Sequence, residues 1–151
     1  MEDRYIVGIS GASGAPYALR VIEWLAESGA EVHVTASSYG RRLLSDELDI
    51  QKMEPATLVS PSLVNRVFVH SGSDKGAPIA SGSFVVKGMV VVPMSGNTLG
   101  AVAGGLTENL VQRAASVTLK ERRTLVLAHR ESPLSPIDIM NMSRLSQAGA
   151  V

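Results

Sequence analysis

The chain has 151 residues, a length that suits one domain. Its 14 basic and 14 acidic residues leave no net charge, so a basic nucleic-acid-binding surface is not expected. The absence of cysteine excludes disulfides, thiolate metal sites and thiol nucleophiles. No apolar run approaches the roughly 20 residues of a membrane span, and the start of the chain lacks a signal-peptide pattern, so a cytoplasmic protein is expected.

The first third of the chain alternates strand and helix patterns. A β-branched run predicts a strand at residues 5–9, and apolar residues at helical spacing predict a helix from Tyr17 that stops near Gly29. A second strand is expected at residues 31–35 and a second helix around residues 41–44.

The same alternation continues to the end of the chain. The remaining predicted elements are strands at 66–70, 88–92 and 124–128 and helices at 99–103, 109–122 and 136–147. The strand at 88–92 is apolar on both faces, as a central parallel strand requires, and is expected to end at Pro93. This order predicts a single α/β domain over residues 1–151, with a parallel sheet between two helical layers and right-handed crossovers.

Residues 149–151 follow the last predicted helix and have the pattern of a helix cap and the first residues of another parallel strand. We therefore expect the protein to continue past this chain with further C-terminal structure. The alternative is a free carboxylate at the mouth of the sheet.

Small residues follow the first predicted strand, at the edge where open α/β sheets bind ligands. Residues 11–14 offer backbone amides, the Ser13 hydroxyl and a helix N-terminus, which together suit a phosphate. No lysine follows as in a Walker loop, and the glycine spacing misses the dinucleotide pattern. The second strand leads into residues 35–37, which lack the acidic residue that would hold a ribose. A single phosphate is favoured over NAD, and glycines that only permit close packing are the alternative.

A second small, polar turn spans residues 93–98, after the strand at 88–92. Its backbone groups can bind a ring edge or a second phosphate. The alternative is a helix cap, in which Asn97 or Thr98 accepts hydrogen bonds from the first helical amides. The two interpretations are compatible.

Charged residues lie on the predicted helix at 109–122 and after the following strand. Arg113 and Lys120 are seven residues apart and nearly in line on one helix face, and Arg130 and Glu131 follow the next strand. These residues could hold an anion, although a solvated face is the alternative for the first two. For residues 122–123, in the last helical turn, interaction with the helix dipole is the favoured explanation.

The other candidate residues are isolated in the sequence. Glu47 could donate or accept a proton, and an exposed acidic turn is the alternative. His33 lies inside a predicted strand and is expected to be a core histidine with its hydrogen bonds satisfied. His70 and His129 look isolated, and no two of the histidines have metal-ligand spacing, so no metal site is expected.

Several stretches, in order along essentially the whole chain, resemble the flavin prenyltransferases, the UbiX family. The resemblance lies in residues 6–15 (IVGISGASGA), 81–84 (SGSF), 88–95 (GMVVVPMS), 98–99 (TL), 113–115 (RAA), 119–123 (LKERR) and 130–134 (RESPL).

The resemblance implies a Rossmann-like flavoprotein that forms homo-oligomers, usually dodecamers, with FMN near the subunit interfaces. Members transfer the dimethylallyl group of dimethylallyl monophosphate to N5 and C6 of reduced FMN, without a metal. The prenylated FMN then serves a UbiD-type decarboxylase. Beyond the end of this chain, the family has a further strand, a tyrosine-containing segment and a late helix with a basic residue.

The resemblance also implies roles for particular residues. It assigns FMN binding to Gly11, Ala12, Ser13, Ser37, Ser95, Gly96, Asn97, Thr98 and Arg130. It places Arg113, Lys120 and Glu131 around the prenyl phosphate, and it gives catalytic roles to Ser13, Glu47, Lys120 and Glu131, the first two in proton handling. Departing phosphate gains negative charge in the transition state, which cations such as Lys120 stabilise.

Two alternatives come from other classes of FMN-binding protein. Flavin-dependent cysteine decarboxylases share the small-residue turn, but they need an active-site histidine and an asparagine in a Pro-x-Met-Asn type motif. Residues 133–135 lack that asparagine, and His33 lies in the middle of a strand. The second alternative is a non-catalytic protein that binds or delivers FMN.

Overall fold

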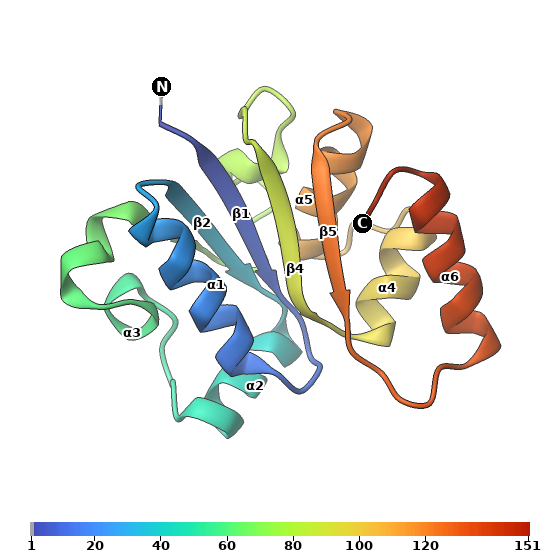
Figure 1. Ribbon diagram of the computed structural model, residues 1–151, viewed down its shortest axis with the longest axis horizontal. Coiled ribbons are helices and arrows are strands. Elements are labelled where there is room, and N and C mark those ends of the chain that lie inside the picture. The colour runs from blue at the N-terminus through green and yellow to red at the C-terminus, as the bar shows by residue number, and fades with distance from the viewer. Residues whose placement is uncertain (1) are drawn as a thin grey trace.

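Five parallel strands form the centre of the molecule in the computed structural model, which describes residues 2–151 (Figure 1). The strands are β1 (Arg4–Ile9), β2 (Glu31–Ala36), β3 (Val67–His70), β4 (Gly88–Met94) and β5 (Thr124–His129). They lie in the order β3-β2-β1-β4-β5, which confirms the predicted parallel α/β sheet. The connections change direction between β1 and β4, which is where open sheets of this kind bind ligands.

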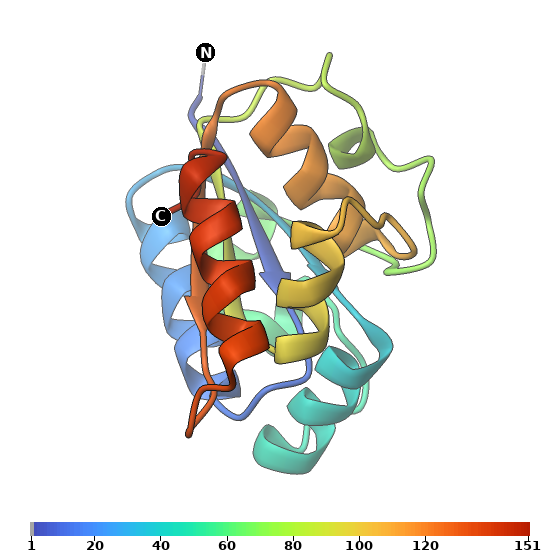
Figure 2. The same cartoon turned by 90° about the vertical axis from the view of Figure 1, so that its right-hand side faces the viewer.

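Helices cover both faces of the sheet. One apolar cluster lies between the sheet and the helices α1 (Ala15–Glu27), α2 (Ser38–Leu48) and α3 (Pro55–Leu58). The other lies under α4 (Gly96–Ala103), α5 (Leu110–Lys120) and α6 (Pro136–Gln147). Short 3₁₀ helices η1 (Pro61–Arg66) and η2 (Pro78–Ala80) complete the connections around β3. Figure 2 shows α6 beside α4, against which it packs.

The three central strands, β1, β2 and β4, are buried on both faces along most of their length, as the apolar run at residues 88–92 predicts for β4. Val7 and Val34 are fully buried under α1, and Met89 and Val91 lie in the opposite cluster. Burial of such side chains contributes about 1.5–3 kcal/mol each, which holds the two helical layers on the sheet. The carboxyl ends of the strands are thereby fixed side by side at one edge.

Two predicted boundaries were wrong for local reasons. Strand β4 continues through Pro93 to Met94, because a register shift after Val91 absorbs the proline and pairing resumes between Met94 and His129. Helix α5 ends at Lys120, because Arg122 adopts a left-handed conformation with φ of 54°.

The sequence suggested that Arg123 interacts with the dipole at the end of α5, but the structure gives its guanidinium other partners. It donates hydrogen bonds to the carbonyl oxygens of Gly82 (2.6 Å) and Phe84 (3.0 Å). Arg123 therefore anchors the segment that leads into β4.

Gly149 and Ala150 close the end of α6, as the predicted helix cap requires, and Val151 then pairs with β5. Val151 donates its amide to the Leu125 oxygen (2.9 Å) and accepts from the Leu127 amide (2.7 Å). These two bonds have the pattern of a parallel pair. In residues 2–151, none of the helices combines the length and the apolar content needed to cross a membrane.

Candidate functional site

Ser10 joins the carboxyl ends of β1 and β4. Its hydroxyl donates to the Pro93 oxygen (3.0 Å) and accepts from the Ser95 amide (2.8 Å), and its own amide donates to the same Pro93 oxygen (3.1 Å). Ser10 is fully buried, so these bonds do not compete with water. They fix the turn after β4 relative to the turn after β1. Sequence reasoning gave Ser10 no role, although a hydroxyl at the end of an apolar strand was the available signal.

The turn after β4 opens α4 with a serine cap. Ser95 accepts from the Thr98 amide (3.2 Å) and donates to the Thr98 hydroxyl (3.1 Å). The expectation that Asn97 or Thr98 is the cap was therefore wrong, because the helix begins at Gly96. The amides of Gly96 and Asn97 have no acceptor among residues 2–151, and such N-terminal donors suit an anion or a polar ring edge.

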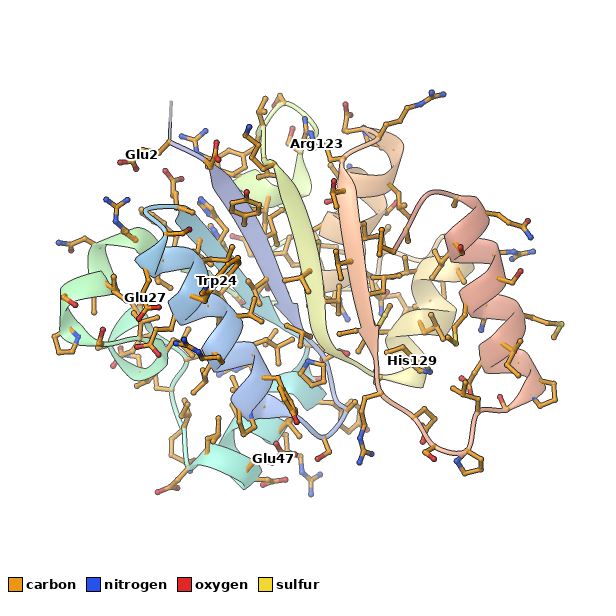
Figure 3. The ribbon with its side chains drawn as sticks, in the orientation of Figure 1. Glu2, Trp24, Glu27, Glu47, Arg123 and His129 are labelled. Carbon is orange, nitrogen blue, oxygen red and sulfur yellow. The ribbon has the colours of Figure 1, made fainter. Side chains whose placement is uncertain are left out.

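Glu47 occupies the N-terminus of α1 (Figure 3). Its carboxylate accepts from the amides of Ala15 (2.9 Å) and Gly14 (3.2 Å). Partial burial raises the pKa of Glu47, but the hydrogen bonds from Ala15, Ser13 and Gly14 outweigh it and, with the charge of Arg130, hold that pKa below its ordinary value. Glu47 is consequently ionised at neutral pH.

This placement corrects the expectation that the N-terminus of α1 is open to a phosphate. A carboxylate already takes two of its donors. The amides of Gly11 and Ser13 have no acceptor within residues 2–151, so the phosphate donors of this turn lie just before the helix.

Helix α2 begins against the same turn. Ser37 caps it by accepting from the Gly40 amide (3.1 Å), and the Ser37 amide donates to the Ile9 oxygen (3.0 Å). A Cβ on Gly40 would overlap the Ile9 oxygen, and a Cβ on Gly11 would lie 2.5 Å from the Tyr39 Cβ. Close packing is therefore one reason for Gly11, as the alternative interpretation of the turn proposed, and for Gly40 as well.

Arg130 and Glu131 follow β5 at the same edge of the sheet. The Arg130 amide donates to the Met94 oxygen (3.1 Å), and the Arg130 charge acts on Glu47. Glu131 is exposed and accepts from the Ser132 amide (3.1 Å). The structure thus gathers most of the predicted FMN-binding set, with Glu47, around the ends of β1, β2, β4 and β5.

Lys120, at the end of α5, does not converge with that group in one chain. Arg113 donates from Nε to the Ala80 oxygen (3.0 Å), and Lys120 pairs with Glu121 (2.6 Å). Lys120 ends α5 just before β5 begins, so the six residues of β5, about 20 Å of strand, separate it from Arg130. Figure 3 shows the nearby Arg123 at the edge of the sheet opposite Glu47 and His129.

His33 and His70 are hydrogen-bonded to each other, so the expectation that His70 is isolated was wrong. Their atoms Nδ1 and Nε2 lie 2.8 Å apart, and His33 Nε2 lies 2.7 Å from Glu31 Oε1. His33 is 5% exposed and satisfied, as predicted for a core histidine. Within residues 2–151, no three histidine or carboxylate side chains form a group that could hold a metal.

A family model described as Flavoprotein matches residues 1–151. The flavin prenyltransferase UbiX of Deinococcus radiodurans is 43% identical over 147 residues, which cover 97% of this chain and 72% of that relative. The corresponding enzyme of Halalkalibacterium halodurans is 39% identical over 148 residues, covering 96% of this chain and 72% of that protein. The chain belongs to the flavin prenyltransferase family.

Solved structures support the membership. The crystal structure of AnUbiX (PadA1) in complex with FMN and dimethylallyl pyrophosphate is 38% identical, with a TM-score of 0.90 over 100% of this flavin prenyltransferase chain and 77% of its own. A dodecameric FMN-dependent UbiX-like decarboxylase from Escherichia coli O157:H7 has a TM-score of 0.87, at 38% identity over 98% of this chain and 77% of its own. The cysteine decarboxylase TvaF is 19% identical with a TM-score of 0.75, over 100% of this chain and 89% of its own, and shares the fold alone.

The residues at this edge fit FMN. A flavin mononucleotide needs anion donors for its phosphate and polar groups for its ring. The free amides of Gly11 and Ser13, the first amides of α4 and the Arg130 side chain provide both kinds of group at one edge.

The paired histidines of this flavin prenyltransferase predict a stability that depends on pH. Burial lowers the pKa of His33, although Glu31 opposes the shift, and burial together with His33 lowers the pKa of His70. Above a pH of about 6.5 both rings are neutral in the folded and the unfolded chain. Below that value the unfolded chain binds protons first, so the free energy of unfolding should fall as the pH drops.

Urea unfolding at pH 7.5 and pH 5.5 measures this effect. The control is His70→Gln, whose side-chain amide can still donate to His33 but does not titrate, and it should lose less stability than the wild type over the same interval. An equal loss in both proteins would contradict the assignment.

Proposed function

We propose that this enzyme transfers the dimethylallyl group of dimethylallyl monophosphate to N5 and C6 of reduced FMN. The observation that carries the proposal is the set of free amides, hydroxyls and one guanidinium at the switch point of the sheet, in a chain that belongs to the flavin prenyltransferase family. The named ligands of AnUbiX, FMN and dimethylallyl pyrophosphate, support the same two substrate classes.

The residues that would hold FMN come from four turns. They are Gly11, Ala12 and Ser13 after β1, Ser37 after β2, Ser95, Gly96, Asn97 and Thr98 after β4, and Arg130 after β5. Bound reduced FMN supplies the nucleophilic nitrogen. The chain contributes orientation, because donors fixed by secondary structure hold one substrate in register with the other.

We assign proton handling to Ser13 and Glu47. The carboxylate of Glu47 accepts from the amides of Gly14 and Ala15, and the neighbouring Ser13 side chain helps to lower its pKa. A carboxylate with a lowered pKa is a weak base, so its direct effect is to orient the Ser13 oxygen. Proton removal during ring closure can use this pair or the released phosphate.

Part of the positive charge that we assign to the leaving phosphate comes from a second copy of the chain. Lys120 lies at the opposite edge of the sheet from Arg130, so it can reach a phosphate at the carboxyl edge only from a second copy. Arg113 and Glu131 would complete the surroundings of the prenyl phosphate. The proposal therefore includes a homo-oligomer, with a dodecamer as the expected form, which the dodecameric relative supports.

A UbiD-type decarboxylase as the recipient of the product and the cytoplasm as the location are further parts of the proposal. Chemistry of this kind makes a modified flavin that has to leave the enzyme before another protein can use it.

The activity is tested by anaerobic incubation of the full-length protein with reduced FMN and dimethylallyl monophosphate. Mass spectrometry should show a flavin heavier by one isoprenoid unit, formed equally well after chelation of metals. Unmodified flavin from FMN-loaded protein would reject the transferase and leave the alternative of an FMN-binding or FMN-delivering protein.

Mixed oligomers test whether Lys120 and Arg130 serve one site from two chains. Lys120→Ala and Arg130→Ala should each slow transfer about 10²-fold or more, since each removes one charged group from a charge-stabilising site. Only the first should retain normal FMN binding.

Oligomers reassembled from equal amounts of the two variants should regain up to about one quarter of the wild-type rate, because random pairing leaves that share of two-chain sites intact. Separately tagged subunits confirm the mixing, and the control is a mixture of each variant with itself. No recovery in oligomers shown to be mixed would place both residues in the same chain's site.

A further inference from the structure

His129 lies at the carboxyl end of β5, next to Arg130 of the proposed FMN site (Figure 3). It is the last residue of β5 and precedes Arg130, and its side chain is 5% exposed. Its Nδ1 lies 3.2 Å from the Met94 oxygen, which also accepts the Arg130 amide at 3.1 Å. One carbonyl oxygen therefore connects the end of β4 with the end of β5.

The geometry determines which ring nitrogen of His129 carries hydrogen. A backbone carbonyl oxygen can only accept, so Nδ1 has to be the donor to Met94. In the neutral ring the hydrogen therefore lies on Nδ1 and the lone pair on Nε2. The Met94 oxygen thus receives two donors, one from the side chain of His129 and one from the backbone of Arg130.

The other side of the ring faces the start of α6. His129 Nε2 is buried without a hydrogen-bond partner among residues 2–151, and it lies 3.9 Å from Asp138 Oδ1. Asp138 itself accepts from the amide (3.0 Å) and the hydroxyl (2.8 Å) of Ser135. A Cβ on Gly96 would lie 3.5 Å from Asp138 Oδ1, so the start of α6 also borders the turn after β4.

We propose that His129 is a positioning residue for FMN. Its Nδ1–H holds the Met94 oxygen and thereby fixes both the turn at residues 95–98 and the backbone of Arg130 before the flavin binds. The inference rests on the proposed function, which assigns FMN contacts to that turn and to Arg130. Ser10 holds the same turn from the β1 side through Pro93, so His129 supplies the second of two anchors.

The physical effect of His129 is preorganisation. A turn that is already ordered loses less conformational entropy when it binds a ligand than one that must be ordered on binding. Loss of the Nδ1–H bond should therefore weaken FMN binding while leaving the bound flavin able to react.

Three variants at position 129 distinguish the effect of the Nδ1–H hydrogen bond from the effect of the volume that the ring fills. Asparagine places its amide nitrogen where Nδ1 lies, glutamine places its amide where Nε2 lies, and phenylalanine fills the space with no donor. FMN binding to His129→Asn should stay within about threefold of the wild type. His129→Gln and His129→Phe should each raise the dissociation constant about tenfold, the effect of losing one hydrogen bond.

Flavin fluorescence titration measures the dissociation constants, and the thermal midpoint of the FMN-free protein checks that each variant is folded. At saturating FMN, the transfer rate of all three variants should stay within about threefold of the wild type, so that the loss appears in KM for FMN rather than in kcat. Wild-type affinity in a folded His129→Phe protein, or equal loss in the Asn and Phe variants, would overturn the proposal.

Nitrogen-15 NMR of the wild type gives a test that does not depend on variants or on activity. The His129 ring should show hydrogen on Nδ1 at every pH at which the protein is folded. A neutral ring with hydrogen only on Nε2 would overturn the proposal. An enzyme that binds FMN with this His129 dependence but forms no prenylated flavin would refute the proposed function and leave the role of His129 intact.

Discussion

The candidate site depends on one structural constraint, which is that the turn after β4 is held from both sides by backbone carbonyl oxygens. The Pro93 oxygen accepts from Ser10 at the end of β1, and the Met94 oxygen accepts from His129 and Arg130 at the end of β5. All of these groups lie at the carboxyl ends of the parallel strands, next to the point between β1 and β4 where the strand order reverses. Ladder bonding in the strands and burial in the two apolar clusters therefore set the geometry of the site.

The charges in this flavin prenyltransferase are divided between the two edges of the sheet. Glu47 and Arg130 lie at the carboxyl edge, together with uncharged amides and hydroxyls. Lys120 lies at the amino edge, paired with Glu121. One chain can thus provide the groups that hold a flavin, whereas Lys120 would have to reach the leaving phosphate from another copy. This separation makes oligomerisation part of the proposed chemistry.

Periodicity and strand composition predicted the five strands, their parallel direction and the extent of α6, because continuous apolar runs and helical spacing are local signals. Helix and strand ends were predicted less well where a single residue decides them, as Ser95 does for α4 and Arg122 for α5. The His33–His70 contact depends on how β2 and β3 align, which no local pattern specifies.

The most informative failures concern residues that act over long sequence distances. Glu47 lies more than 30 residues from the α1 terminus that it caps, so its sequence neighbours gave no indication of that contact. The seven-residue spacing of Arg113 and Lys120 correctly placed them on one helix. It could not show that the helix runs away from the carboxyl edge of the sheet, which follows from the tertiary fold.

A crystal structure of the full-length protein with FMN tests the central claim most directly. The account predicts the flavin at the carboxyl edge between β1 and β4, with Arg130 of one copy and Lys120 of another beside it, and with Met94 still held by His129. An empty carboxyl edge with FMN bound elsewhere, or Lys120 of every copy directed into bulk water, would contradict it.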